Sequence, residues 1–131
     1  MDFVNVSDIL ESEDREVVTE PVPEWNGKVA RLMAMTGDDR DKFEAHVSNG
    51  KADGTINVVG MRALLVGMCL VDANNKRLFS DDGVKKLGRK SAKVLGRLFD
   101  RCVKLNGISK EDQEELMENF EEDPSEFSTT D

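Results

Sequence analysis

Residues 91–107 read SAKVLGRLFDRCVKLNG, a pattern that predicts an amphipathic helix. Ser91 suits the N-cap of this helix, and Gly107 suits the position just past its end. At about 100° per residue, one face holds Leu95, Leu98, Cys102 and Leu105, with Val94 and Phe99 at its flanks. Such a face is typical of a helix that packs against a hydrophobic core.

Beside this face runs a narrow basic stripe, formed by Lys93, Arg97, Arg101 and Lys104. Cationic side chains form strong hydrogen bonds with carboxylates and phosphates, so the stripe predicts contact with an acidic partner. Trp25 lies in a turn-rich loop, where a tryptophan either packs onto its own core or anchors a partner. The candidate partner-binding residues are Trp25, Lys86, Lys90, Lys93, Arg97, Arg101 and Lys104.

The composition indicates one soluble, mainly α-helical domain. A chain of 131 residues is long enough for one hydrophobic core, and it is 38% hydrophobic and 34% charged, with no tyrosine. The longest apolar run, residues 63–71, is far shorter than the roughly 18 residues that a membrane-spanning helix needs. Residues 1–16 have acidic flanks and no cleavage site, unlike a secretory signal. We therefore expect a cytoplasmic protein without a membrane partner.

The net charge of −9 is spread unevenly along the chain. Residues 1–24 carry eight acids and one base, residues 25–110 carry nine acids and 17 bases, and residues 111–131 carry ten acids and no base. A basic middle therefore lies between two acidic ends. From this we predict a flexible acidic arm over residues 1–14, one mostly helical domain over 15–120, and a disordered acidic tail over 121–131. A short docking helix at residues 6–10 is an alternative for part of the arm.

The first half of the domain combines strand and helix signals. Residues 15–19 and 28–35 are strand-like and flank PVPEWNG, residues 21–27, which predicts an N-terminal β-hairpin with a long loop. Residues 36–50 predict a helix capped by Thr36, with Phe43 and Val47 on its apolar side.

The second half of the domain is predicted to be helical. Residues 57–71 form the most hydrophobic segment and predict the central buried helix, capped by Asn57. Along one side lie Gly60, Ala63 and Gly67, which would let another helix approach closely. A short helix over residues 81–87 is capped by Ser80, and a further helix over 109–120 begins at Ser109.

Two segments resemble ligand-binding motifs but lack essential residues. DANNKRLFSDDG, residues 72–83, is similar to a calcium loop, but Arg77 replaces the required glycine and Gly83 replaces the closing glutamate. It predicts a polar turn. GVKKLGRKS, residues 83–91, approaches a phosphate-binding loop, but Arg89 interrupts the Gly-Lys pair and no buried strand precedes it. We therefore expect no metal and no nucleotide.

The sequence contains no arrangement that is typical of an enzyme. Cys69 and Cys102 lie in apolar helical segments far apart in the sequence and are expected to be reduced core residues. His46 is the only histidine, with no second ligand nearby, so a structural or surface role is expected. No acid/base pair, nucleophile motif or zinc spacing is present, and we expect neither catalysis nor a cofactor.

From residue 23 to about residue 115 the chain shows a characteristic order of short motifs. These are PEWNG, MTGDDRDKFEAHV, and then LVDANNKRLFSDDGVKKLGRKSAKVLGRLFDRCVKLNGIS after the apolar helix. In this order and spacing the chain resembles the tail assembly chaperones of long-tailed bacteriophages. The acidic arm and the acidic tail match no motif of that family.

The resemblance implies a non-enzymatic, mostly helical protein made in the cytoplasm of the infected host and absent from the mature virion. Its implied partners are the phage tape measure protein, which it keeps soluble, and the tail tube protein, which it helps to recruit. The family also implies self-association and, in many members, a longer form made by a ribosomal frameshift.

One hypothesis links that role to charge. Helices 57–71 and 91–107 would form the core, while the basic stripe would meet the acidic ends of a neighbouring copy, its own tail, or the client. Salt would then weaken assembly.

Two other functions remain open. A nucleic-acid-associated regulator would use Lys86, Lys90 and the basic stripe on phosphates, with the acidic arms as phosphate mimics. The net charge, the lack of a DNA-reading helix pair and the absence of aromatic residues among the cations argue against it. A structural component of the virion is the third possibility.

Overall fold

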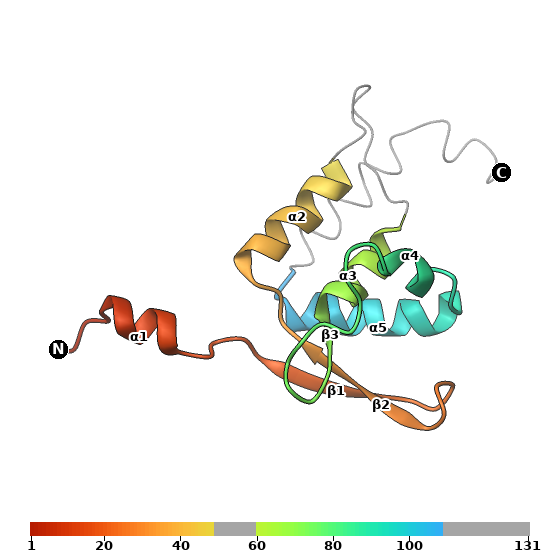
Figure 1. The fold of residues 1–131 in the computed structure, drawn as a ribbon, viewed down its shortest axis with the longest axis horizontal. Coiled ribbons are helices and arrows are strands. Elements are labelled where there is room, and N and C mark those ends of the chain that lie inside the picture. The colour runs from red at the N-terminus through yellow and green to blue at the C-terminus, as the bar shows by residue number, and fades with distance from the viewer. Residues whose placement is uncertain (49–59, 109–131) are drawn as a thin grey trace.

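A computed structural model describes residues 1–48 and 60–108. The elements run in the order α1 (Val6–Glu11), β1 (Val17–Val22), β2 (Lys28–Met33), α2 (Gly37–Ser48), α3 (Met61–Cys69), β3 (Leu70–Val71), α4 (Val84–Leu87) and α5 (Ala92–Leu105) (Figure 1). The predicted class, mainly helical with an N-terminal β-hairpin, is confirmed. The cap at Asn57, the helix over 109–120 and the tail over 121–131 lie outside the described residues.

The three strands form one antiparallel sheet in the order β1-β2-β3. The hairpin pairs Val18 with Leu32, and its loop is closed by the Trp25 N–H, which donates to the Val22 carbonyl at 2.9 Å. Asn26 and Gly27 both have positive φ, 60° and 69°. Asn-Gly tolerates this left-handed backbone better than other pairs, which explains why the chain reverses here.

The sheet packs one face against the helices. Because side chains alternate along a strand, Val18, Leu32 and Ala30 share a face, and all three join the core cluster. α5 lies against α3 and against β1, so it contacts both the central helix and the hairpin. α5 therefore joins the central helix to the hairpin through its apolar face.

The helix predicted over residues 91–107 is confirmed as α5. The Ser91 hydroxyl accepts from the Val94 N–H at 3.4 Å, and Gly107 follows the helix with φ 65°. The buried residues of α5 are Val94, Leu95, Leu98, Cys102 and Val103, while Phe99 and Leu105 are half-buried. The apolar face is therefore rotated slightly from the predicted one.

The predicted central helix is shorter than the sequence indicates. α3 begins at Met61, after Gly60 in a left-handed conformation, so the predicted packing role of Gly60 within the helix is wrong. Leu70 and Val71 leave the helix and form β3, where they pair with Leu32 and Arg31 of β2. The hydrophobic run continues through both elements, which is why the sequence pattern alone does not reveal the boundary.

The predicted close approach at Gly67 is confirmed. A Cβ atom added at Gly67 would lie 2.7 Å from Cγ2 of Val84 in α4, which is too close for a normal contact. Ala63 is also buried, and a Cβ added at Gly88 would lie 3.5 Å from its methyl group. Small residues on α3 therefore allow α4 to pack directly against it.

The other capped and turn segments follow the predicted chemistry. The Thr36 hydroxyl accepts from the Asp39 N–H at 3.1 Å at the start of α2, whose Phe43 and Val47 are buried. Residues 72–76 form a polar turn, in which a carboxylate oxygen of Asp72 accepts from the backbone N–H groups of Lys76 and Asn74. These bonds lower the pKa of Asp72. α4 begins at Val84, later than the predicted residue 81.

The two cysteines are buried and free, and the fold brings them together. Cys69 ends α3, Cys102 lies on α5, and their thiols are hydrogen-bonded to each other. The bond to Cys69 and burial raise the pKa of Cys102 above its ordinary value. Both residues therefore act as core residues in this fold.

α1 lies within the segment predicted as an acidic arm. Asn5 and Asp8 form a reciprocal capping box, in which the Asn5 side chain accepts from the Asp8 N–H at 2.8 Å and the Asp8 carboxylate accepts from the Asn5 N–H at 3.0 Å. No residue of α1 is buried, and the helix projects away from the rest of the molecule (Figure 1).

Candidate functional site

A groove of about 860 Å³ lies between the hairpin and the segment that joins β3 to α4. We call it the hairpin groove. Its volume falls within the roughly 300–1,000 Å³ of typical ligand pockets. Its apolar lining includes Val22, Trp25, Val29, Leu70, Leu78, Phe79 and Leu87. The groove therefore offers an apolar surface that a partner side chain could enter.

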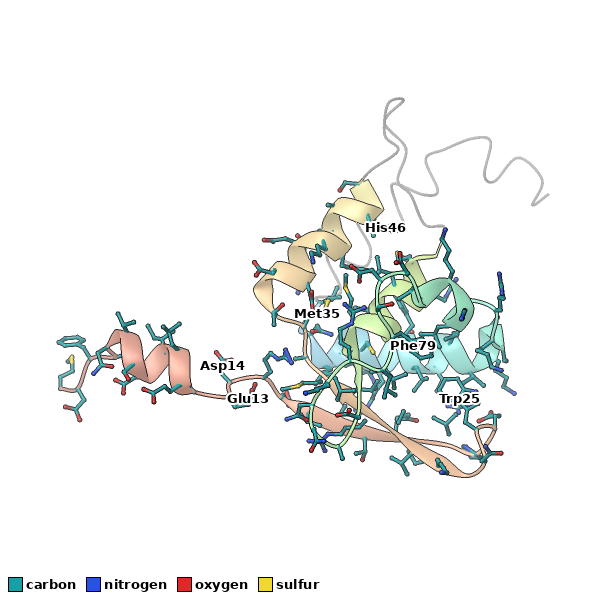
Figure 2. All side chains as sticks on the ribbon, in the orientation of Figure 1. Glu13, Asp14, Trp25, Met35, His46 and Phe79 are labelled. Carbon is teal, nitrogen blue, oxygen red and sulfur yellow. The ribbon has the colours of Figure 1, made fainter. Side chains whose placement is uncertain are left out.

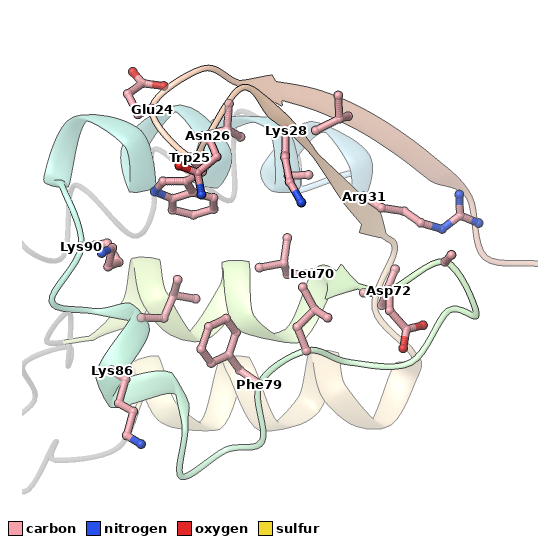
Figure 3. A pocket seen from close by; sticks show the side chains of 17 residues that line it. Glu24, Trp25, Asn26, Lys28, Arg31, Leu70, Asp72, Phe79, Lys86 and Lys90 are labelled. Atoms are coloured by element: carbon pink, nitrogen blue, oxygen red, sulfur yellow. The ribbon is translucent and has the colours of Figure 1, made fainter.

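Two aromatic side chains face the groove from opposite sides. Trp25 comes from the hairpin loop and Phe79 from the segment before α4, and both are half-buried against the core (Figures 2 and 3). Leu78 and Val29 are more exposed, at 55% and 57%. Large apolar side chains with so much exposed surface in a groove are typical of a contact surface for another protein.

The charged side chains around the groove are mostly basic. Lys86 and Lys90 lie at one end of the groove and Arg31 and Asp72 at the other (Figure 3). The Arg31 guanidinium donates to the Asn75 side-chain oxygen at 2.8 and 3.1 Å, so it is already held in place. Lysines that are exposed beside an apolar groove fit a partner that combines apolar and acidic groups.

The basic stripe of α5 lies outside this groove, and part of it is paired within the chain. Arg97 donates to both carboxylate oxygens of Glu24, at 2.8 and 3.1 Å, and its Nε lies 3.9 Å from Glu20. Arg101 lies 3.7 Å from Glu20. The hairpin is thus a partner of the stripe that the sequence analysis did not consider. Two of the six cations that a nucleic-acid regulator would use are engaged in these pairs.

The seven predicted partner-binding residues fall into two groups. Trp25, Lys86 and Lys90 line the hairpin groove, whereas Lys93, Arg97, Arg101 and Lys104 lie on α5. Partner binding by either group stays a prediction. Leu78 and Phe79 were not predicted as site residues. Their only signal in the sequence is that two adjacent apolar residues follow a polar turn.

The Arg97–Glu24 pair gives a testable pH response. The hydrogen bonds from Arg97 lower the pKa of Glu24 from its usual 4.5 to about 2. We expect NMR titration of the Glu24 carboxyl to show this low pKa, and Arg97→Gln to move it back toward 4.5. Because the folded-state pKa lies below the unfolded one, the pair stabilises the fold above about pH 4.5, and this contribution is lost as the pH falls toward 2.

The matched control for that titration is Lys93→Gln. Lys93 acts on Glu24 only through space, so this variant should change the pKa of Glu24 much less than Arg97→Gln does. A wild-type Glu24 that titrates near 4.5 would show that the bidentate pair does not persist in solution.

The described part of the chain contains no cluster of three or more His, Cys, Asp or Glu side chains that could hold a metal ion. Of the helices in residues 1–48 and 60–108, none is both long and apolar enough to cross a membrane. The site chemistry in these residues is therefore that of the hairpin groove and the ion pairs of α5.

No protein-family model matches the sequence, and no curated protein matches it. A solved structure does share the fold: the tail assembly chaperone of bacteriophage HK97, with a TM-score of 0.56 and 19% sequence identity. The match covers 76% of this chain and 91% of the HK97 chain. In fold, the chain is therefore similar to a phage tail assembly chaperone.

Proposed function

We propose that the chain is a non-enzymatic tail assembly chaperone of a long-tailed phage, and that the hairpin groove binds its client. The observation that carries this proposal is the shared fold with the HK97 tail assembly chaperone. The client is the tape measure protein, which the chain keeps soluble in the host cytoplasm before the tail is complete. Recruitment of tail tube subunits, through this chain or a longer frameshifted form, belongs to the same proposal.

The chemistry of the groove supports a helical client. A tape measure protein presents long amphipathic helices, which insert apolar side chains from one face into hydrophobic grooves. Trp25, Leu78 and Phe79 would contact that face, and Lys86 and Lys90 would pair with acids at its flank. The volume of the groove suits a few side chains of a docked helix, with the helix itself lying across the opening.

Co-expression tests the proposal. A tape measure protein of the same phage is produced alone, with the wild-type chain, or with the double variant Leu78→Asp/Lys90→Glu. Both positions are exposed, so the variant should fold normally. We expect the wild-type chain to raise the soluble fraction of the client severalfold, and the double variant to lose most of that gain.

Lys85→Glu is the matched control, because Lys85 is exposed on α4 but does not line the groove. It should keep the solubilising activity. A client that is equally soluble with and without the wild-type chain would contradict the chaperone function. If the wild-type chain works and the double variant works as well, the function stands but the client binds elsewhere. Recovery of the chain from purified virions would favour a structural component instead.

A further inference from the structure

We propose that the hairpin groove of one copy receives the N-terminal arm, residues 1–14, of a second copy of this chain. The apolar side of α1 would contact the aromatic side chains of the groove, and the acids of the arm would pair with the lysines beside it. Copies of the chain would thereby associate through α1, which buries no residue within its own chain.

Uncovered large apolar side chains gather on two surfaces of the chain. In residues 1–48 and 60–108, every exposed large hydrophobic side chain belongs either to the arm or to the hairpin groove. In the arm, Phe3 is 81% exposed, Ile9 58% and Leu10 77%. Burying such groups removes apolar surface from water, so the two uncovered apolar surfaces of the chain favour contact with each other.

α1 already has the residue spacing of a docking helix. Val6, Ile9 and Leu10 have the i, i+3, i+4 spacing that places side chains on one face of a helix. Asp8 is engaged in the capping box with Asn5, which fixes the start of the helix. Helices this short are marginal alone in water, and a partner groove would supply the missing packing.

The arm and the rim of the groove carry opposite charges. Through residue 14 the arm carries five acids, Asp2, Asp8, Glu11, Glu13 and Asp14, and no basic side chain. Around the groove, Lys28, Lys86 and Lys90 are exposed, and Glu24 is bound to Arg97. An acidic helix and a lysine-flanked groove are complementary, which speeds encounter and selects the orientation of docking.

The geometry favours the arm of a second copy over the chain's own arm. The chain is fixed from Arg15 onward, because Arg15 contacts the Met33 sulfur at 2.8 Å and the Glu16 carbonyl accepts from Ala34 at 2.9 Å. From this anchor the hairpin runs toward Trp25, whereas Glu13 and Asp14 lead the chain the other way, so α1 lies on the side opposite the Trp25 end of the groove (Figures 1 and 2).

The same contact would regulate access of a client to the groove. This regulatory role, unlike the contact itself, rests on the proposed function. An acidic amphipathic arm has the same chemistry as the client helix that the groove is proposed to bind. The arm of a neighbouring copy would therefore occupy the groove until a client helix replaces it.

Sedimentation equilibrium of the purified full chain, without any client, tests the contact. We compare the wild type with an arm variant, Ile9→Asp/Leu10→Asp, and a groove variant, Lys86→Glu/Lys90→Glu. All four positions are exposed, so circular dichroism should show unchanged folding. Each variant is expected to weaken self-association at least about tenfold. An equimolar mixture of the two should associate more tightly than either alone, because it pairs one intact arm with one intact groove.

Two controls carry similar charge changes outside the contact. Lys42→Glu and Lys85→Glu each reverse the charge of an exposed lysine, on α2 and α4, that does not line the groove. Both should associate like the wild type, within about threefold. A wild type that stays monomeric at all concentrations, a mixture that recovers nothing, or controls as weak as the variants would overturn the proposal. Failure of the co-expression test would leave this measurement unaffected.

Discussion

Replacement of Asn106 by alanine is expected to lower the free energy of unfolding by about 2–3 kcal/mol. Its side-chain oxygen accepts from the Met35 N–H at 2.6 Å. Its side-chain nitrogen donates to the Cys102 carbonyl at 2.8 Å and to the Cys69 sulfur at 3.3 Å. One side chain thus joins the segment after β2, the end of α3 and the end of α5. Alanine would remove all three bonds and leave the Met35 N–H without this acceptor.

Urea unfolding followed by circular dichroism measures the loss. Asn74→Ala is the matched control, because Asn74 is exposed in the turn after β3 and should cost less than about 0.5 kcal/mol. Asn106→Asp keeps an acceptor for Met35 but has no donor for the Cys102 carbonyl. It should therefore be no more stable than Asn106→Ala at neutral pH. A loss below about 0.5 kcal/mol in Asn106→Ala would contradict the joining role.

Asn106 also illustrates what the sequence could not predict. Asn106-Gly107 is recognisable as a helix end because the signal is local, and the same holds for the caps at Ser91 and Thr36. Two of the three partners of the Asn106 side chain, Met35 and Cys69, lie in distant segments, which no local pattern reports. The apolar face of α5 was predictable, because the regular spacing of its apolar residues is a property of that one segment.

Strand β3 was missed because its partner is remote. Leu70 and Val71 continue an apolar run that is equally compatible with helix, and only the open edge of β2 makes them a strand. The Arg97–Glu24 pair has the same character, since it joins α5 to the hairpin loop. Sequence patterns therefore predicted most of the elements, but not the pairing of β2 with β3 or of α5 with the hairpin loop.

The candidate site was predictable residue by residue but not as a whole. Trp25, Lys86 and Lys90 stand out by residue type and by their place in the chain. Their common surface arises because the hairpin loop folds over the segment between β3 and α4. Leu78 and Phe79 complete that surface. Their role could not be predicted from their own segment, because it depends on the hairpin residues that line the other side of the groove.

Alanine substitutions at two helical glycines are expected to change stability in opposite directions. At Gly67 a new Cβ would lie 2.7 Å from Cγ2 of Val84, and the β-branched valine cannot easily rotate away. Overpacking of a core typically costs about 1–3 kcal/mol, more than the roughly 1 kcal/mol that alanine gains over glycine in a helix. Gly67→Ala should therefore lower the free energy of unfolding by about 1 kcal/mol.

Gly96 of α5 is the matched control. A Cβ atom there would meet nothing within 4 Å, so only the helix propensity should act. Gly96→Ala is expected to raise the free energy of unfolding by about 0.5–1 kcal/mol. Both variants are measured by urea unfolding, together with Val84→Ala and the double variant Gly67→Ala/Val84→Ala. Because the smaller side chain removes the clashing Cγ2, the double variant should be more stable than the sum of the two single losses predicts. Strict additivity, or a stabilising Gly67→Ala, would show that α4 does not pack against α3 as closely as the 2.7 Å approach requires.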